Sequence, residues 1–217
     1  MKLNDLSLKL SELFDFHRKE LKNRKQSEIV SRGLVFSEID PQAELLICGF
    51  NPSLRTDFLK TEKSYDYNLV KNFDRYFKKF EPLILSTEFG LKVSYFDLFY
   101  QKHSKQKEID CFYQDEKGLS FLQAQLSLTK QLIVEIKPKV ILVFNKQAIP
   151  FFEFHPKHKI GMGFNLIKKS KVNSFYCAEL ECFIYPSRFL NHFVKQQELA
   201  TIKIEIHQLL RKLMKDK

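Results

Sequence analysis

The chain has 217 residues, of which 44% are hydrophobic and 29% are charged, a composition typical of one soluble domain with a sizeable core. No apolar run approaches the ~18 residues that a membrane helix needs, and the N-terminus lacks the apolar block of a signal peptide. We therefore expect a single domain over residues 1–217, a cytoplasmic location and no membrane association.

The charge and the cysteines narrow the classes of partner and cofactor. The formal net charge is +10, which favours polyanionic partners, nucleic acid first and membrane surfaces second. A surface whose many lysines only contact solvent would give the same excess of positive charge. No C-x-x-C pair occurs among the four cysteines, which are Cys48, Cys111, Cys177 and Cys182. We therefore expect reduced thiols, no metal and no cofactor.

The first half of the chain predicts helix, strand and helix. Apolar residues at helical spacing over 5–31 predict an amphipathic helix packed on the domain. The apolar run of residues 45–50 then ends at Asn51, Pro52 and Ser53, which predicts a buried strand closed by a turn, with Asn51 as N-cap of a following helix. The polar stretch up to residue 67 is long for a connector, and such loops are often functional. We expect a further helix from about 68 to 80, ended by Pro82.

The second half continues the alternation. Residues 91–99 predict a strand that runs into a basic loop at 100–107, and residues 122–136 predict a helix. Residues 139–144 are β-branched and apolar, as in a central strand, and Asn145 is expected to cap a short helix reaching Phe154. A basic segment at 155–170, strands at 175–180 and 182–185, and a helix at 199–213 complete the pattern.

This alternation predicts an α/β fold, a three-layer α/β/α sandwich with a central, mostly parallel four-stranded sheet. Ligands of such sheets bind beyond the carboxyl ends of the strands. The polar residues that directly follow the predicted strands are Asn51, Asp97, Asn145 and Ser187. We therefore expect these four side chains to gather at one edge of the sheet, beside a basic rim.

Several standard sites are missing from the sequence. There is no G-x-x-x-x-G-K-[ST] phosphate loop, no G-x-G-x-x-G and no G-x-S-x-G. His155 and His158 are three residues apart and could share a metal, but a metal site is not favoured for this pair. For His103 and His192 a phosphate contact or solvent exposure is favoured over a role as general base.

One motif resembles a known family. Residues 49–53, Gly-Phe-Asn-Pro-Ser, resemble the glycine–apolar–Asn-Pro-Gly/Ser segment of the uracil-DNA glycosylase superfamily, most closely its mismatch-specific uracil/thymine branch. Residues 137–144 are similar to the third strand of that family and its approach. Residues 185–189, Tyr-Pro-Ser-Arg-Phe, stand where the family carries a His-Pro-Ser or Asn-Pro-Ser loop. The resemblance covers roughly residues 40–210 and indicates a divergent member.

The resemblance implies hydrolysis of the N-glycosidic bond of uracil, or of a related damaged or mismatched base, in DNA. Such an enzyme extrudes the base into a pocket. Asn51 would orient the attacking water, because an amide is too weak a base to deprotonate it. Phe50, Tyr65 or Tyr67 would stack on the base, and Asp97 would accept a hydrogen bond from the pyrimidine N3–H. The alternatives are an N-cap for Asn51, core packing for Phe50 and a structural role for Asp97.

The same resemblance implies contacts to the DNA backbone. Ser53 and Ser187 would contact phosphates, Arg188 would hold the adjacent backbone, and Phe189 would be wedged into the base stack. The basic loop at 100–107 would add Lys102 and Lys105. We expect a metal-free monomer. Two alternatives stay open: a non-catalytic or redirected member of this fold that binds nucleic acid or a nucleobase-like ligand, and an unrelated small-molecule α/β enzyme with a closed pocket.

Overall fold

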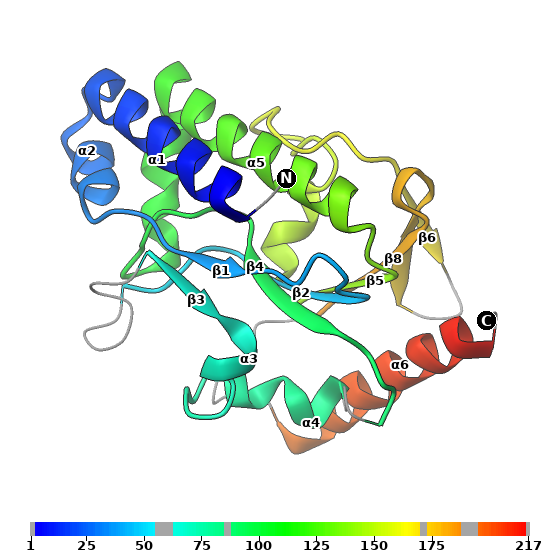
Figure 1. Ribbon diagram of the computed structural model, residues 1–217. Helices are drawn as coiled ribbons and strands as arrows, with labels where there is room; N and C mark the ends of the chain where they lie inside the picture. Colours follow the sequence, from blue (N-terminus) through cyan, green and yellow to red (C-terminus); the bar gives the residue numbers. More distant parts are fainter. Residues whose placement is uncertain (1–2, 55–62, 85–87, 170–172, 188–194, 216–217) are drawn as a thin grey trace.

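The computed structural model describes residues 3–54, 63–84, 88–169, 173–187 and 195–215 (Figure 1). Within these residues the main sheet has six strands in the order β4-β2-β5-β8-β7-β6, and β1 and β3 form a separate parallel pair. The strands are β1 (Phe36–Glu38), β2 (Leu45–Gly49), β3 (Ser64–Asp66), β4 (Val93–Asp97), β5 (Val140–Val143), β6 (Leu166–Lys169), β7 (Ser174–Cys177) and β8 (Cys182–Pro186).

Helices precede, separate and follow these strands. The α-helices are α1 (Leu3–Glu20), α2 (Arg24–Ser31), α3 (Tyr67–Val70), α4 (Glu81–Ile84), α5 (Glu116–Ile136) and α6 (Gln196–Lys215). The 3-10 helices are η1 (Phe77–Lys79), η2 (Gln106–Tyr113), η3 (Lys146–Phe151) and η4 (Ala178–Leu180). No helix among the described residues is both long and apolar enough to cross a membrane.

The sheet is larger and more mixed than the sequence predicts. Strands β4, β2, β5 and β8 are parallel, but β7 and β6 add two antiparallel strands beyond β8. The α/β class is thus confirmed, and the expectation of four strands is wrong. The overlooked strand β6 exposes Ile167, Lys168 and Lys169, so it lacks the buried, apolar pattern that identifies the central strands.

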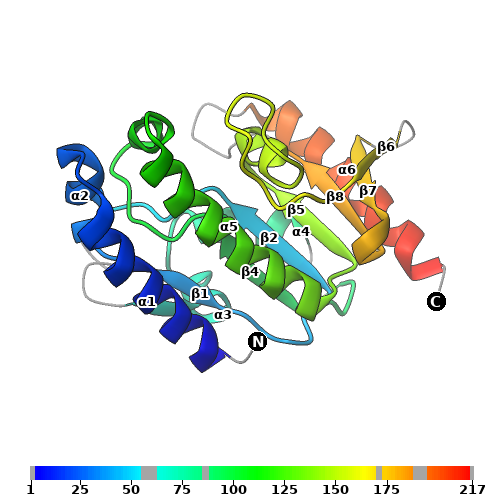
Figure 2. The ribbon, with the colours of Figure 1, turned by 90° about the horizontal axis from the view of Figure 1, so that it is seen from above.

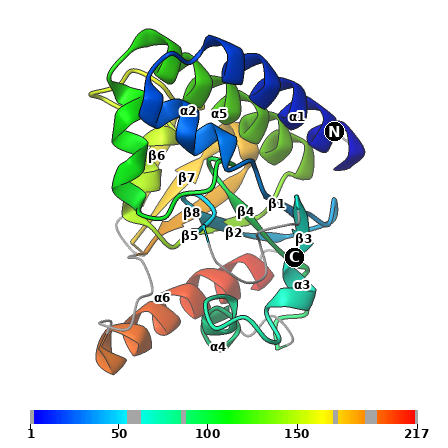
Figure 3. The same cartoon turned by 90° about the vertical axis from the view of Figure 1, so that its left-hand side faces the viewer.

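Helices cover both faces of the sheet (Figures 2 and 3). Alternate residues of a strand point to opposite faces of the sheet. Leu46 and Cys48 of β2 pack in the hydrophobic cluster on the side of α1 and α5. Leu45 and Ile47 pack in the hydrophobic cluster on the side of α4 and α6. The central strands are therefore apolar throughout because both of their faces are buried.

Two of the expected helices are interrupted. The N-terminal helix is divided into α1 and α2, because Asn23 caps α2 by accepting a hydrogen bond from the Lys25 N–H at 3.0 Å. The helix expected over 68–80 is replaced by α3, η1 and α4. There the Asp74 carboxylate accepts from the Tyr76 N–H at 2.8 Å, a local bond that competes with a continuous helix. Pro82 lies inside α4 and does not end a helix.

Helix α5 holds the chain that leaves β4. The buried Gln125 side chain accepts a hydrogen bond from the Tyr100 N–H at 2.8 Å. The Tyr100 hydroxyl lies 3.0 Å from the Thr129 hydroxyl, which in turn donates to the Leu98 carbonyl at 3.2 Å. These bonds fix the backbone just beyond the carboxyl end of β4, where the candidate site lies.

The Gln125 bond gives a first prediction. Gln125→Leu leaves the buried Tyr100 N–H without an acceptor, so we expect it to lower the free energy of unfolding by ~1–3 kcal/mol. Gln131→Leu, at an exposed position of the same helix, should change it by no more than ~0.5 kcal/mol. Urea unfolding followed by circular dichroism measures both values. Equal stability of the two variants would contradict the assigned role of Gln125.

Candidate functional site

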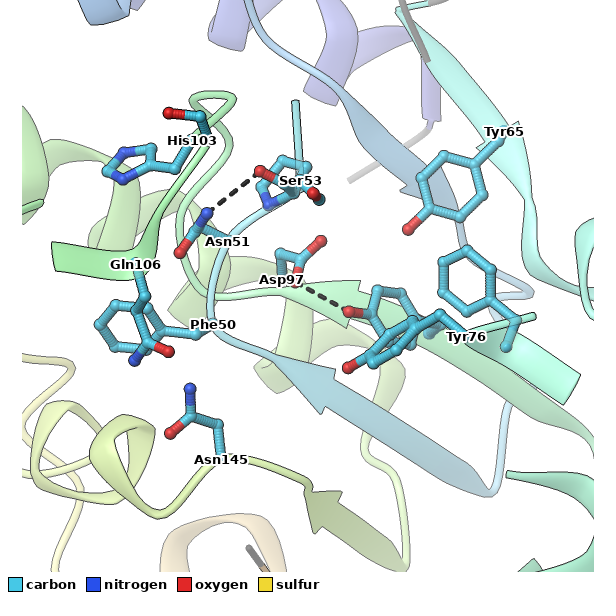
Figure 4. Close-up of a pocket in the computed structure, with 13 residues that line it drawn as sticks. Phe50, Asn51, Ser53, Tyr65, Tyr76, Asp97, His103, Gln106 and Asn145 are labelled. Atoms are coloured by element: carbon cyan, nitrogen blue, oxygen red, sulfur yellow. Dashed lines mark hydrogen bonds between the residues drawn. The ribbon is translucent and has the colours of Figure 1, made fainter. Parts of the chain in front are cut away.

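A cavity of about 200 Å³ lies at the carboxyl ends of β2, β4 and β5 (Figure 4). This volume would hold several water molecules at ~30 Å³ each, and it is below the ~300 Å³ at which pockets for drug-sized ligands begin. The cavity therefore suits a small ring. Its lining includes Phe50, Asn51, Ser53, Tyr65, Tyr76, Asp97, His103, Gln106 and Asn145.

The parallel strand register brings three of the four expected polar residues together. Gly49 pairs with Asp97 on β4, and Cys48 pairs with Val143 on β5. Asn51 lies two residues after Gly49, and Asn145 lies two residues after Val143. Both side chains therefore line the same cavity as Asp97. The fourth residue, Ser187, does not. It lines a separate cavity of about 210 Å³.

The Asn51 turn is not a helix N-terminus. The Asn51 Nδ2 donates to the Pro52 carbonyl at 3.0 Å, and Ser53 forms a parallel bridge with His103. The His103 N–H donates to the Pro52 carbonyl at 3.0 Å, and the Leu54 N–H donates to the His103 carbonyl at 2.7 Å. The expected cap is wrong because these bonds hold the chain extended. The amide nitrogen of Asn51 forms a hydrogen bond within the turn. The amide oxygen of the same side chain can accept a hydrogen bond.

Asp97 lies on the floor of the cavity and is only 5% exposed. Its carboxylate accepts a hydrogen bond from the Tyr95 hydroxyl at 2.9 Å. Burial, and after it the charge of Asp97, raises the pKa of Tyr95 well above its ordinary value, so the phenol stays protonated and keeps donating. A Cβ on Gly49 would lie 2.0 Å from the Tyr95 Oη and 2.1 Å from the Asp97 Oδ1. Only glycine leaves room for this pair.

Aromatic rings form the cavity walls. Tyr65 lies in a group of rings, 5.4 Å from Phe77 and 6.4 Å from Tyr95 between centroids. Phe50 lines another part of the cavity and packs against Phe99 at 5.4 Å. The expected stacking role of Tyr67 does not fit the structure. Tyr67 is fully buried behind the wall, stacked on Tyr95 at 6.1 Å.

Asn145 is a cavity residue whose orientation is set by its helix. Its Oδ1 accepts a hydrogen bond from the Gln147 N–H at 3.1 Å as N-cap of η3, which confirms the expected cap. The amide nitrogen then points into the cavity (Figure 4). The position of Asn145 after a strand signalled this placement, but it was not among the residues expected to contact a base.

His103 is buried, so solvent exposure, one of the two roles favoured for it beside a phosphate contact, is wrong. It is 2% exposed, and it lines the cavity with its ring stacked on Phe112 at 6.4 Å. Both ring nitrogens are enclosed and lack a hydrogen bond of good geometry, and the nearby Lys105 backbone raises the pKa less than burial lowers it. Burial lowers the pKa of His103 to about 4, so the imidazole is neutral at pH 7. The surrounding basic loop favours an exposed histidine, and no local sequence signal indicates that this one turns inward.

The expected DNA-contacting residues differ in their exposure to solvent. Ser53 lies exposed at the cavity, and Lys105 is exposed at the start of η2. Lys102 is only 4% exposed, and burial lowers its pKa. It therefore cannot belong to an exposed basic patch; its backbone N–H donates to the Gly33 carbonyl. Arg188, Phe189 and His192 lie outside the described residues.

Tyr185, which stands where the resembled family has His or Asn, turns away from the cavity. It is 1% exposed, packs in the cluster beneath α6 and donates its hydroxyl proton to Glu205. Burial, and after it the hydrogen bond to Glu205, raises the pKa of Tyr185. This side chain supports the packing of α6.

The loop that carries His103 is fixed by Glu108. This carboxylate accepts hydrogen bonds from the Ser104 N–H and hydroxyl, both at 2.8 Å, and from the Arg32 guanidinium at 2.7 Å. Burial alone would raise the pKa of Glu108, but the bonds from Arg32 and Ser104 outweigh it and lower the pKa to about 2. The ion pair thus ties the cavity loop to α2.

His155 and His158, the pair that could share a metal by its sequence spacing, lie side by side as packed rings. His158 stacks on Tyr113 at 3.7 Å, and His155 lies 4.6 Å from His158 between ring centroids. Across the part of the chain that the structure describes, no group of three or more His, Cys, Asp or Glu side chains could hold a metal ion.

No protein-family model matches the sequence, and no curated protein matches it. Cavity geometry and residue chemistry are therefore the basis for a functional proposal.

Gly49→Ala tests the packing of the cavity floor. Because the added methyl overlaps Tyr95 and Asp97, we expect the free energy of unfolding to fall by ~1–3 kcal/mol and the near-ultraviolet tyrosine dichroism to change. Urea unfolding and circular dichroism measure the two effects. A variant with wild-type stability and spectrum would show that this close approach is absent.

Glu108→Gln tests the loop clamp through its pH dependence. A carboxyl whose pKa is lower in the folded state stabilises the fold above its ordinary pKa of ~4.3, and that stabilisation is lost as the pH falls toward about 2. We expect the variant to be less stable than wild type at pH 7, and the difference to shrink between pH 4 and 2. Glu12→Gln, at an exposed glutamate, should follow wild type in urea unfolding at each pH. A constant Glu108→Gln deficit would exclude the assigned charge effect.

Proposed function

We propose that this protein is a DNA glycosylase that hydrolyses the N-glycosidic bond of uracil or a related damaged or mismatched base. It would act as a metal-free, cytoplasmic monomer. The observation that carries the proposal is the convergence of Asn51, Asp97 and Asn145 on one small, aromatic-walled cavity. Such a cavity matches the requirement to enclose, stack and read a single extruded base.

The polar groups suit the edge of a pyrimidine. The Asp97 carboxylate is a hydrogen-bond acceptor, and the Asn145 amide nitrogen is a donor that points into the cavity. A ring that carries N–H beside C=O would satisfy both groups. The ring faces would meet Phe50 or Tyr65, whose side chains line the same cavity.

Asn51 is suited to orient water. Its amide oxygen can accept a hydrogen bond from a water molecule, which directs a lone pair of the water at C1′ of the extruded nucleotide. The C1′–N bond would break first, with its electron pair leaving on the base. Nearby DNA phosphates would stabilise the oxocarbenium ion. Water would then add to this cation and lose a proton, which the departed base anion takes up.

DNA binding would rely on residues outside the cavity. The chain carries a net charge of +10, whereas the residues found to line the cavity include no lysine or arginine. Phosphates would therefore contact the rim, where Ser53 and Lys105 are exposed. Ser187, which is 3% exposed, and Arg188 and Phe189, which lie outside the described residues, are proposed as DNA contacts from the sequence resemblance alone.

Asn51→Ala tests the proposed chemistry. With the water no longer oriented, we expect release of uracil from single-stranded and G·U duplex oligonucleotides to slow by on the order of 100-fold. Asn165→Ala, at an exposed asparagine that is not among the cavity-lining residues, should leave the rate unchanged. The assay is alkaline cleavage of end-labelled DNA at abasic sites. If the wild type releases no base, or Asn51→Ala is as fast, the proposal fails.

A second candidate is a non-catalytic or redirected member of this fold that binds nucleic acid or a nucleobase-like ligand. The burial of Tyr185 against Glu205 favours it, because no side chain from that position reaches the cavity. Salt-sensitive DNA binding without base release would support this candidate over the enzyme.

A further inference from the structure

A basic hairpin over residues 154–161 has no part in the chemistry proposed above. Its first and last residues form an antiparallel bridge. The His155 N–H donates to the Ile160 carbonyl and the Lys159 N–H donates to the His155 carbonyl, both at 2.8 Å. These bonds close a tight turn that exposes Lys157 and Lys159 to solvent.

The body of the protein holds this hairpin in place. The Gln123 side chain on α5 accepts a hydrogen bond from the Gly161 N–H at 2.8 Å and donates to the Gly161 carbonyl at 3.0 Å. The His158 ring stacks on Tyr113, the last residue of η2, at 3.7 Å between centroids. A surface that is already fixed loses little conformational freedom on binding, which favours affinity.

Stacked rings connect the hairpin with the cavity wall. The Phe151 ring lies 6.0 Å from the ring of Phe50, which lines the cavity, and 4.8 Å from the ring of His155. Along the chain, the cavity residue Asn145 caps η3, which ends at Phe151. The hairpin therefore lies close to the cavity, at the carboxyl end of β5.

The two lysines of the hairpin have no ion-pair partner. Neither Lys157 nor Lys159 forms an ion pair or a side-chain hydrogen bond with any residue that the structure describes, whereas Lys117 of α5 pairs with Glu20. The neighbouring carboxylate of Glu153 accepts a hydrogen bond from a backbone N–H of β6 at 3.4 Å. Both ammonium groups are thus available to an anion.

Lys159 has a backbone conformation that lysine rarely adopts. Its φ is 59°, in the left-handed region where glycine is the least strained residue. A turn that served folding alone would favour glycine or asparagine at this position. Strained residues cluster at functional sites, so the conformation is consistent with a binding role for the ammonium group.

The hairpin also carries an exposed aromatic ring. Phe154 is 61% exposed, and its ring is seated against Gly163, where a Cβ would lie 2.8 Å from the ring. A ring in such a fixed position can stack on an unpaired base, whereas the bases of a duplex are already stacked on each other. Cations that bind the backbone, together with an aromatic ring that binds a base, are typical of surfaces for single-stranded nucleic acid.

We propose that the 154–161 hairpin binds single-stranded DNA beside the cavity. Lys157 and Lys159 contact backbone phosphates, and Phe154 stacks on an unpaired base. The identity of the nucleic acid as DNA rests on the proposed function, whereas the charges and the ring define the surface independently of the cavity. The hairpin would hold the strand next to the nucleotide that enters the cavity.

The salt dependence of DNA binding tests the two lysines. Fluorescence anisotropy gives the affinity for labelled oligothymidine at several salt concentrations. Each phosphate contact to a single strand contributes ~0.7 to the slope of log affinity against log salt, so Lys157→Gln with Lys159→Gln should reduce the slope by ~1.4. Lys92→Gln with Arg211→Gln removes the same charge at exposed positions before β4 and in α6, and should leave the slope unchanged. Equal slopes for the two double variants would overturn the proposal.

Phe154→Ala tests the stacking on a base. It should weaken oligothymidine binding about tenfold with the salt slope unchanged, because no charge is lost. Leu8→Ala, at an apolar residue of α1 that is 58% exposed, is the matched control and should bind as wild type does. Wild-type affinity of Phe154→Ala would overturn the stacking contact.

Lys159→Gly separates binding from folding. Glycine relieves the left-handed φ, so urea unfolding should show no loss of stability, while the affinity for oligothymidine falls because one phosphate contact is lost. Unchanged affinity would overturn the proposal. So would a wild type that binds phosphatidylglycerol vesicles through these lysines but does not bind oligothymidine.

Failure of this inference can be told apart from failure of the proposed function, because oligothymidine contains no uracil. If the hairpin variants weaken its binding but the wild type releases no base from uracil-containing DNA, the binding surface stands and the glycosylase proposal fails. If the wild type releases base and the hairpin variants do so with unchanged kcat/KM and unchanged DNA affinity, the glycosylase proposal stands and the hairpin assignment fails.

Discussion

The candidate site depends on one close approach, that of β4 side chains over the last residue of β2. Gly49 and Asp97 are paired in register, and the absence of a side chain on Gly49 lets the Tyr95 hydroxyl reach the Asp97 carboxylate. That hydrogen bond holds a carboxylate under the cavity and places Tyr95 within the aromatic wall. The same hydrogen bond therefore joins the acidic floor of the cavity to its aromatic wall.

The distribution of charge is the second organising feature. The chain is strongly basic as a whole, yet the cavity lining combines one carboxylate with amides, hydroxyls and a neutral imidazole. A polyanion would thus be attracted to the molecule but excluded from the cavity, and an uncharged ring would be accepted there. Under the proposed function, the phosphate backbone of DNA needs positive charge and the base needs an uncharged cavity, and the two features occupy different places on this molecule.

The sequence predicts the parts of this fold that are determined by local pattern. The buried runs around Ile47 and Ile141 identify the central strands, and Asn145 identifies its helix cap, because burial and capping leave direct marks on residue type. Asn51, Asp97 and Asn145 could be placed at one edge from strand order alone. The edge strand β6 could not be recognised, since its exposed lysines carry no strand pattern.

Side-chain direction was the least predictable property. Tyr65 lines the cavity and Tyr67 does not, although they are two residues apart, because α3 begins at Tyr67 and turns that ring behind the wall. The burial of His103 and Lys102 depends on contacts between distant segments, such as the hydrogen bonds that join this loop to Pro52 and Gly33. Such tertiary contacts leave no mark on the spacing of residues.

The lysines of β6 have a consequence for how copies of this protein meet. A strand at the margin of a sheet offers unpaired N–H and C=O groups to any other extended chain, which invites aggregation. Lys168 and Lys169 are exposed on that strand, and bringing two such margins together would place like charges side by side. At the opposite margin, β1 lies against β4. Both edges of the main sheet are therefore protected from pairing with another chain. Electrostatic repulsion protects the β6 edge, and β1 covers the β4 edge.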